Sequence, residues 1–62
     1  MNDITITVTL SDGEAWHYAQ FLKRACFRDY EQRAASEDEA STMVAAGEKI
    51  REALREKGYA PR

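Results

Sequence analysis

The alternation of side chains along residues 4–10 constrains the fold of this chain more than any other feature. Aliphatic residues and threonines take turns there: Ile4, Ile6, Val8 and Leu10 are separated by Thr5, Thr7 and Thr9. This period of two predicts a half-buried strand over about residues 3–10. The sequence has no second segment of this kind, and a lone strand leaves its backbone N–H and C=O groups unpaired. We therefore expect the strand to pair with that of a second copy, in a homodimer.

Two helix starts follow the expected strand. Each is marked by a capping box, in which a serine and a glutamate three residues later satisfy each other's free backbone N–H groups. The two pairs are Ser11 with Glu14 and Ser36 with Glu39. Apolar residues then recur at helical spacing behind each pair. These signals predict helices over about residues 12–34 and about residues 37–57.

The similar lengths of the two helices and their short joint favour an antiparallel hairpin. A continuous helix that bends near Asp29 is the alternative that the sequence leaves open. With the strand in front, the prediction is a single β-α-α domain over residues 1–62, of the α+β class but mostly helical. The register of the paired strands, and any exchange of helices between the subunits, stay open.

Two glycines carry specific expectations. Gly47 lies on the apolar stripe of the second helix, where glycine costs about 1 kcal/mol of helix propensity relative to alanine. We therefore expect another helix to approach closely at this position. Gly58 suits the left-handed position just after a helix end, and Tyr59 is then placed to contact Leu54.

The size of the chain favours oligomerisation. Domains of fewer than about 70 residues usually need disulfides, a metal or a partner subunit for stability, and this chain has 62 residues. Cys26 is the only cysteine, so no disulfide can form within the chain. Cys26 and His17 are also the only soft metal ligands, so no metal is expected. We expect Cys26 to be buried on the apolar stripe of the first helix.

The sequence also bears on where the chain acts. No apolar run approaches the roughly 20 residues of a membrane-spanning helix, and no signal-peptide pattern is present. A single thiol is typical of a reducing compartment. We therefore expect a cytoplasmic protein with no membrane partner.

No set of residues in the sequence predicts catalysis. A nucleophile, a base and an orienting group cannot be assembled, so we expect no enzyme, no catalytic residues and no cofactor. The first helix instead carries more aromatic and basic residues than a hairpin can bury, and such residues often anchor a binding partner. The candidate partner-binding residues are Phe21, Lys23, Arg24, Arg28 and Tyr30. The alternating charges of the second helix favour an ion-paired, solvated face.

Several short segments resemble small uncharacterised proteins of bacteriophages and prophages. These segments are Leu10-Ser11-Asp12, Glu14-Ala15-Trp16, Ala19-Gln20-Phe21-Leu22-Lys23-Arg24 and Gly58-Tyr59-Ala60-Pro61-Arg62. The resemblance covers about a third of the chain. It implies a protein that binds and modulates a host protein or defence complex, for example as an anti-CRISPR-like inhibitor, in the host cytoplasm.

The order of strand, capped helix and second helix also resembles the ribbon-helix-helix repressors, whose paired strands read the DNA major groove. That resemblance implies a DNA-binding dimer in which Thr5, Thr7 and Thr9 would face the bases. We keep this function as the alternative, because the net charge of −2 gives no general attraction to DNA. The acidic start of the second helix, at residues 37–39, also disfavours contact with phosphate.

Overall fold

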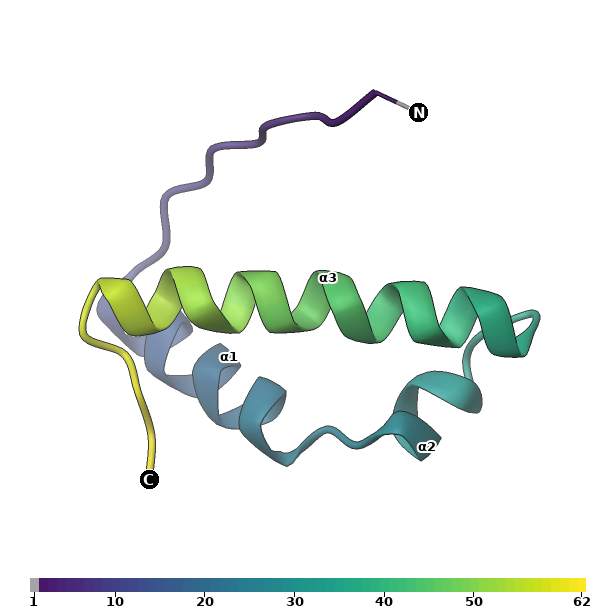
Figure 1. Ribbon diagram of the computed structural model, residues 1–62. Coiled ribbons are helices and arrows are strands. Elements are labelled where there is room, and N and C mark those ends of the chain that lie inside the picture. The colour runs from purple at the N-terminus through teal and green to yellow at the C-terminus, as the bar shows by residue number, and fades with distance from the viewer. Residues whose placement is uncertain (1) are drawn as a thin grey trace.

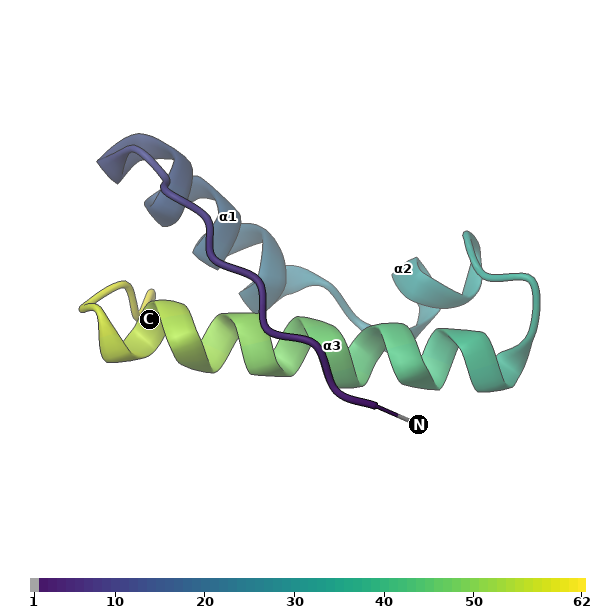
Figure 2. The ribbon, with the colours of Figure 1, turned by 90° about the horizontal axis from the view of Figure 1, so that it is seen from above.

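Three helices make up the folded part of the computed structural model, which describes residues 2–62. They are α1 (Asp12–Arg24), α2 (Phe27–Glu31) and α3 (Glu37–Glu56). The chain runs through α1 and α2, turns, and returns along α3, against which both shorter helices pack (Figure 1). Seen from above, α1 is inclined to α3, and α2 lies near the other end of α3 (Figure 2).

The structure of residues 2–10 contradicts the sequence prediction. Residues 2–62 contain no strand, so the predicted strand over about residues 3–10 and the α+β class are wrong. A strand exists only where a neighbouring segment takes up its backbone hydrogen bonds, and the rest of the described chain is helix or turn. The ribbon-helix-helix architecture, which depends on that strand, is wrong for the same reason.

Residues 2–10 instead form an extended arm, called the N-terminal arm below. No hydrogen bond within residues 2–62 joins it to the helices, and all of its residues are exposed. Figure 1 shows it leaving the start of α1 and rising over α3. The four predicted dimer-strand residues and the three predicted DNA-reading threonines therefore lie on an arm and not on a sheet.

The start of α1 confirms the first capping box. Ser11 Oγ accepts a hydrogen bond from the Glu14 N–H at 3.1 Å, and Glu14 Oε1 accepts one from the Ser11 N–H at 2.8 Å. The second capping box forms only in part: Ser36 Oγ accepts a hydrogen bond from the Glu39 N–H at 3.1 Å, but Glu39 Oε1 accepts one from the Ala35 N–H at 3.2 Å and not from the Ser36 N–H. Both caps satisfy backbone donors that a helix start leaves free.

The predicted helix over residues 12–34 is interrupted. Ala25 has an extended backbone (φ −66°, ψ 126°), and a new helix begins after Cys26. The cause lies in Asp29, whose Oδ2 accepts a hydrogen bond from the Cys26 N–H at 2.8 Å. Neither a single hairpin of two long helices nor one bent helix is therefore correct. Cys26 is exposed at this joint, so its predicted burial is also wrong.

The end of α3 forms as predicted. Gly58 has a φ of 97°, which residues with a side chain rarely adopt. The Tyr59 N–H donates to the Leu54 carbonyl at 2.9 Å, and the Gly58 N–H donates to the Arg55 carbonyl at 2.9 Å. These two bonds are those of a Schellman motif. The Tyr59 ring folds back onto the core beside Leu54.

The core that these helices enclose is small. Its buried apolar side chains are Ala15, Ala19, Leu22, Ala40 and Leu54. Three of the five are alanines, so little apolar area is removed from water. The Tyr59 ring extends the core by packing edge-on against Trp16, with ring centroids 5.1 Å apart, and its hydroxyl donates to Asp12 Oδ1 at 2.7 Å.

Gly47 of α3 lies against the side chain of Tyr30 from α2. It is buried, and a Cβ atom added there would overlap the hydroxyl of Tyr30 and lie 3.6 Å from Leu22 Cδ2. The packing reason expected for Gly47 is present, but what approaches closely is the Tyr30 side chain and not a helix backbone. The missing side chain leaves room for the Tyr30 ring against α3.

Lowering the pH is expected to destabilise the first turns of α1 and α2. Hydrogen bonds from the Ser11 backbone lower the pKa of Glu14 below its ordinary 4.5, and those from the Cys26 backbone lower the pKa of Asp29 below its ordinary 3.8. A lowered folded-state pKa gives stability that is complete above the ordinary value and is lost as the pH falls through the folded-state value. Far-ultraviolet circular dichroism between pH 7 and pH 2 should therefore show helix loss below about pH 4.5. The double variant Glu14→Gln, Asp29→Asn should flatten that part of the profile, and an unchanged profile would contradict the assignment.

Within residues 2–62, no helix is both long and apolar enough to cross a membrane.

Candidate interaction surfaces

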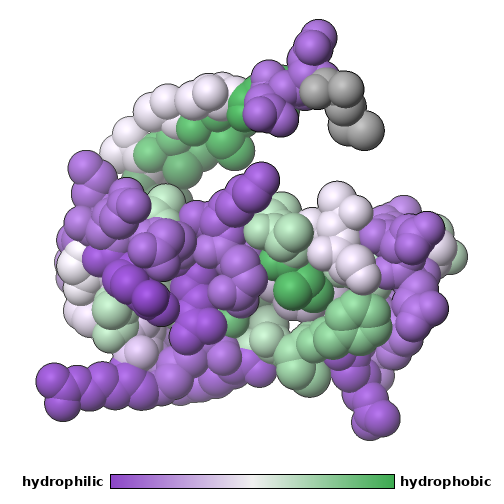
Figure 3. All heavy atoms as spheres, viewed as in Figure 1, coloured by the Kyte–Doolittle hydropathy of each residue, from purple (hydrophilic) through white to green (hydrophobic). Residues whose placement is uncertain are grey.

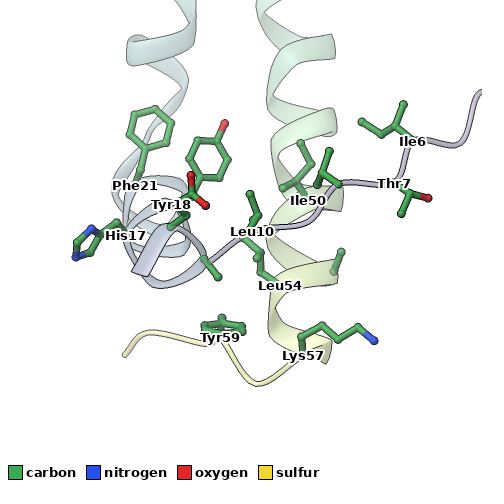
Figure 4. A pocket seen from close by; sticks show the side chains of 14 residues that line it. Ile6, Thr7, Leu10, His17, Tyr18, Phe21, Ile50, Leu54, Lys57 and Tyr59 are labelled. Carbon is green, nitrogen blue, oxygen red and sulfur yellow. The ribbon is translucent and has the colours of Figure 1, made fainter. Parts of the chain in front are cut away.

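An apolar groove lies between α1, α3 and the N-terminal arm. It has a volume of about 1170 Å³. Its apolar lining consists of Ile6, Val8 and Leu10 from the arm, Ala15, Tyr18 and Phe21 from α1, Ile50, Ala53 and Leu54 from α3, and Tyr59. In the close view, Leu10, Tyr18 and Leu54 point into the space between the helices, whereas His17 and Lys57 point away from it (Figure 4).

The arm covers this groove without closing it. Figure 3 shows the arm arching over the helices, with apolar residues on its inner side, paler residues on its outer side and open space beneath. The exposed fractions of its side chains agree, at 85% for Ile4, 72% for Ile6 and 69% for Val8. Apolar side chains on both walls of the groove are thus left in water.

The helical wall of the groove is exposed as well. The exposed fractions are 46% for Tyr18, 53% for Phe21 and 42% for Ile50. The rings of Tyr18 and Phe21 stack on each other, with centroids 5.5 Å apart and planes 27° apart. Exposed apolar area that gathers on one face usually marks an interaction site.

A second surface surrounds the joint between α1 and α2. We call it the α1–α2 junction and define it by the residues Phe21, Lys23, Arg24, Arg28, Tyr30 and Arg33. Phe21, Tyr30 and Arg33 line a hollow of about 440 Å³, together with Met43 of α3. Arg24 and Arg28 are exposed, and Lys23 and Tyr30 are half-buried.

The charges of the α1–α2 junction differ from those of the rest of the chain. Residues 20–33 hold four basic and two acidic residues, a net charge of +2, whereas the whole chain has −2. Within residues 2–62, no ion pair involves these four cations; Arg24 Nη2 only donates a weak hydrogen bond to Gln20 Oε1 at 3.4 Å. On α3, by contrast, Arg51 pairs with Glu48 at 3.9 Å and Arg55 with Glu52 at 3.4 Å. The predicted ion-paired face of the second helix is confirmed.

Two ionisable groups at the joint between α1 and α2, Asp29 and Tyr30, have shifted pKa values. Hydrogen bonds from the Cys26 backbone lower the pKa of Asp29, and the charges of Arg28 and Arg33 lower it further. Burial raises the pKa of the Tyr30 hydroxyl, and the negative charges of Glu48 and Asp29 act in the same direction. At neutral pH Asp29 is therefore charged, and the Tyr30 phenol, which packs against Gly47 of α3, is neutral.

A protein-family model matches residues 1–62 of the chain. The matching model describes a family of unknown function, DUF7706. The chain belongs to this family. The comparisons with curated proteins and with solved structures found no match. The family description assigns no activity, so the surfaces of this chain are the features that bear on its function.

The structure separates the residues that the sequence singled out in this DUF7706 chain. It brings Phe21, Tyr30 and Arg33 to one hollow, whereas Arg24 and Arg28 are exposed and do not line it. The sequence analysis did not identify the groove residues Tyr18, Ile50 and Ala53 as a surface. Their spacing along two helices is the same as that of core residues, and only the placement of α1 against α3 reveals them. Within residues 2–62, no three His, Cys, Asp or Glu side chains gather as metal ligands would.

Proposed function

We propose that this chain acts by binding another protein through the α1–α2 junction, without catalysing a reaction. The observation that carries the proposal is that residues 20–33 hold exposed arginines, which form no ion pair within residues 2–62, together with the exposed ring of Phe21. Arginine and aromatic residues supply most of the binding energy in protein interfaces, where they are commonly flanked by groups of lesser effect. Here Arg24 and Arg28 are exposed without acidic partners, next to Phe21 and the half-buried Tyr30.

The charge of the junction supports an acidic protein surface as the target. Cations that have no partner within their own chain steer and orient an oppositely charged partner. DNA is a weaker candidate, because the acidic start of α3 at Glu37, Asp38 and Glu39 follows the junction directly along the chain. Those carboxylates would repel phosphate groups. The strand that was expected to read DNA bases is also absent from residues 2–62.

The resemblance to phage proteins supports a bacterial host protein as the target, in the host cytoplasm. Small phage proteins of this kind often block a host protein, and a defence complex such as a CRISPR effector is the target class that we would test first. The proposal therefore describes a host-protein modulator that works by occupying a surface.

Reversing the junction charges is expected to abolish target binding. Tagged wild-type protein, the variant Arg24→Glu, Arg28→Glu and the variant Lys49→Glu, Arg55→Glu would each be used to capture proteins from a nuclease-treated bacterial lysate. The last variant has the same change of net charge, on α3. We expect quantitative mass spectrometry to find a bacterial protein that wild type and the α3 variant retain, and that the junction variant retains at least tenfold less.

Two results would contradict the proposal. Equal retention by all three proteins would remove the junction as the binding surface. Material that is retained from an untreated lysate but not from the nuclease-treated one, and that competes with duplex DNA in a salt-dependent manner, would identify a nucleic acid as the target instead.

A further inference from the structure

The exposed surface of the chain is larger than that of a compact protein of its mass. A folded monomer of 7.1 kDa is expected to expose about 4,100 Å², whereas this chain exposes 5448 Å². The excess is roughly 1,300 Å² by that scaling. A standard protein interface removes about 800 Å² from each partner. The excess exposed area is therefore larger than the area that one partner buries in an interface of standard size.

Much of this excess exposed area is apolar and lies on one face. Among the most exposed large apolar side chains are Ile4, Ile6 and Val8 of the arm, and of these Ile6 and Val8 line the groove between α1 and α3. The opposite wall carries the exposed Tyr18 and Ile50. Each wall is thus an apolar surface that lacks a counterpart, with open space between the two (Figure 3).

From this geometry we propose that a second copy of the chain covers the face, with the arm of each copy lying across the groove of the other. A two-fold symmetric interface needs a surface that is complementary to itself. This face meets the condition, because it carries both a projecting apolar arm and an apolar groove to receive one. The proposal concerns a different surface from the α1–α2 junction, apart from Phe21 at their border.

The charges around the groove are compatible with two identical faces in contact. Its charged lining residues at neutral pH are Glu14 and Lys57, and His17 is counted as neutral, so the two faces carry no net repulsion. A second copy is also present wherever the chain is made, whereas a foreign target is not. A chain whose core is mostly alanine needs its missing apolar contacts from the moment it folds.

Light scattering at about 100 µM protein, above the dissociation constants of specific interfaces, is the first test. Wild type should have twice the mass of the 7.1 kDa chain. The variant Ile6→Glu, Val8→Glu should raise the dissociation constant at least 100-fold and give monomer, because its charges would enter the apolar groove. The matched variant Thr5→Glu, Thr9→Glu changes the outer side of the same arm and should remain dimeric. Monomeric wild type, or a dimer that survives in the first variant, would overturn the proposal.

If the variant Ile6→Glu, Val8→Glu fails to fold, disulfide cross-linking tests the proposal instead. In a Cys26→Ser background, a chain with Ile6→Cys is mixed with a chain with Ile50→Cys under mild oxidation. Because the arm of one copy would lie over α3 of the other, a covalent heterodimer should form rapidly. Replacing Ile6→Cys by Thr5→Cys should slow the reaction several-fold. Equal rates in the two mixtures, or no heterodimer in either, would contradict the exchanged arms.

Discussion

Replacing Leu22 by alanine is expected to lower the free energy of unfolding by about 2–5 kcal/mol. Leu22 is 4% exposed and is the only large side chain that α1 contributes to the core. Its loss would leave a cavity between Ala19 and Leu54 that alanines cannot fill. A chain of this length has about 3–9 kcal/mol of stability in total, so the variant should lose a large share of it.

Urea denaturation followed by circular dichroism, at one fixed protein concentration, measures this effect. Phe27→Ala is the control, because it removes a larger side chain from a position that is 40% exposed and lines neither hollow. Its cost should be clearly smaller than that of Leu22→Ala. A loss of less than about 0.5 kcal/mol for Leu22→Ala, the size of an ordinary surface substitution, would show that the described core does not hold the helices together.

The effect of alanine at Gly47 is expected to change sign with the residue at position 30. In the wild-type background the new Cβ would overlap the Tyr30 hydroxyl and force α2 away from α3. This overpacking should cost about 1–3 kcal/mol, which outweighs the gain in helix propensity. In a Tyr30→Phe background the hydroxyl is absent, and the nearest remaining ring atom lies at the 3.4 Å of an ordinary contact. Gly47→Ala should then stabilise the chain by about 1 kcal/mol.

A double-mutant cycle over the four proteins tests this coupling, with stability again measured by urea denaturation. We expect a coupling free energy of about 2 kcal/mol or more between the two positions. Gly13→Ala is a useful reference, since it also replaces a helical glycine but meets no atom within 4 Å. Additive effects at positions 30 and 47 would mean that Tyr30 does not pack against Gly47.

Local signals in the sequence predicted the helix ends well. The first capping box, the second N-cap and the glycine C-cap each depend on a few consecutive residues, and the structure contains all of them. The break after Ala25 was missed because cysteine is not a usual N-cap residue. The one available signal was Asp29, three residues after Cys26, whose carboxylate accepts the free backbone N–H.

The strand could not be judged from its own residues. Alternating isoleucine and threonine is typical of a strand, but a strand also requires a partner, and no segment of residues 2–62 provides one. The pattern did identify which side of the arm is apolar. The groove beneath it depends on how α1 crosses α3, and contacts between distant residues of this kind are not encoded in the spacing along either helix.

The two proposed surfaces are compatible in one assembly. A dimer held through the arms would present two α1–α2 junctions, each with exposed Arg24 and Arg28. Two linked binding surfaces can exceed the affinity of one by a factor of about 10²–10⁴ when the target also offers two sites. Monomeric arm variants should therefore bind such a target more weakly even though their junctions are unchanged.

The central claim is that a second copy covers the apolar face of this chain. The most direct test is to measure how the melting temperature depends on protein concentration. Unfolding of a dimer into two chains is opposed by mass action. With about 2.1 cal/mol/K of unfolding entropy per residue, a hundredfold increase in concentration should raise the melting temperature of the wild-type protein by about 10 °C. A melting temperature that stays constant over that range would show that the monomer folds alone, and would contradict the account.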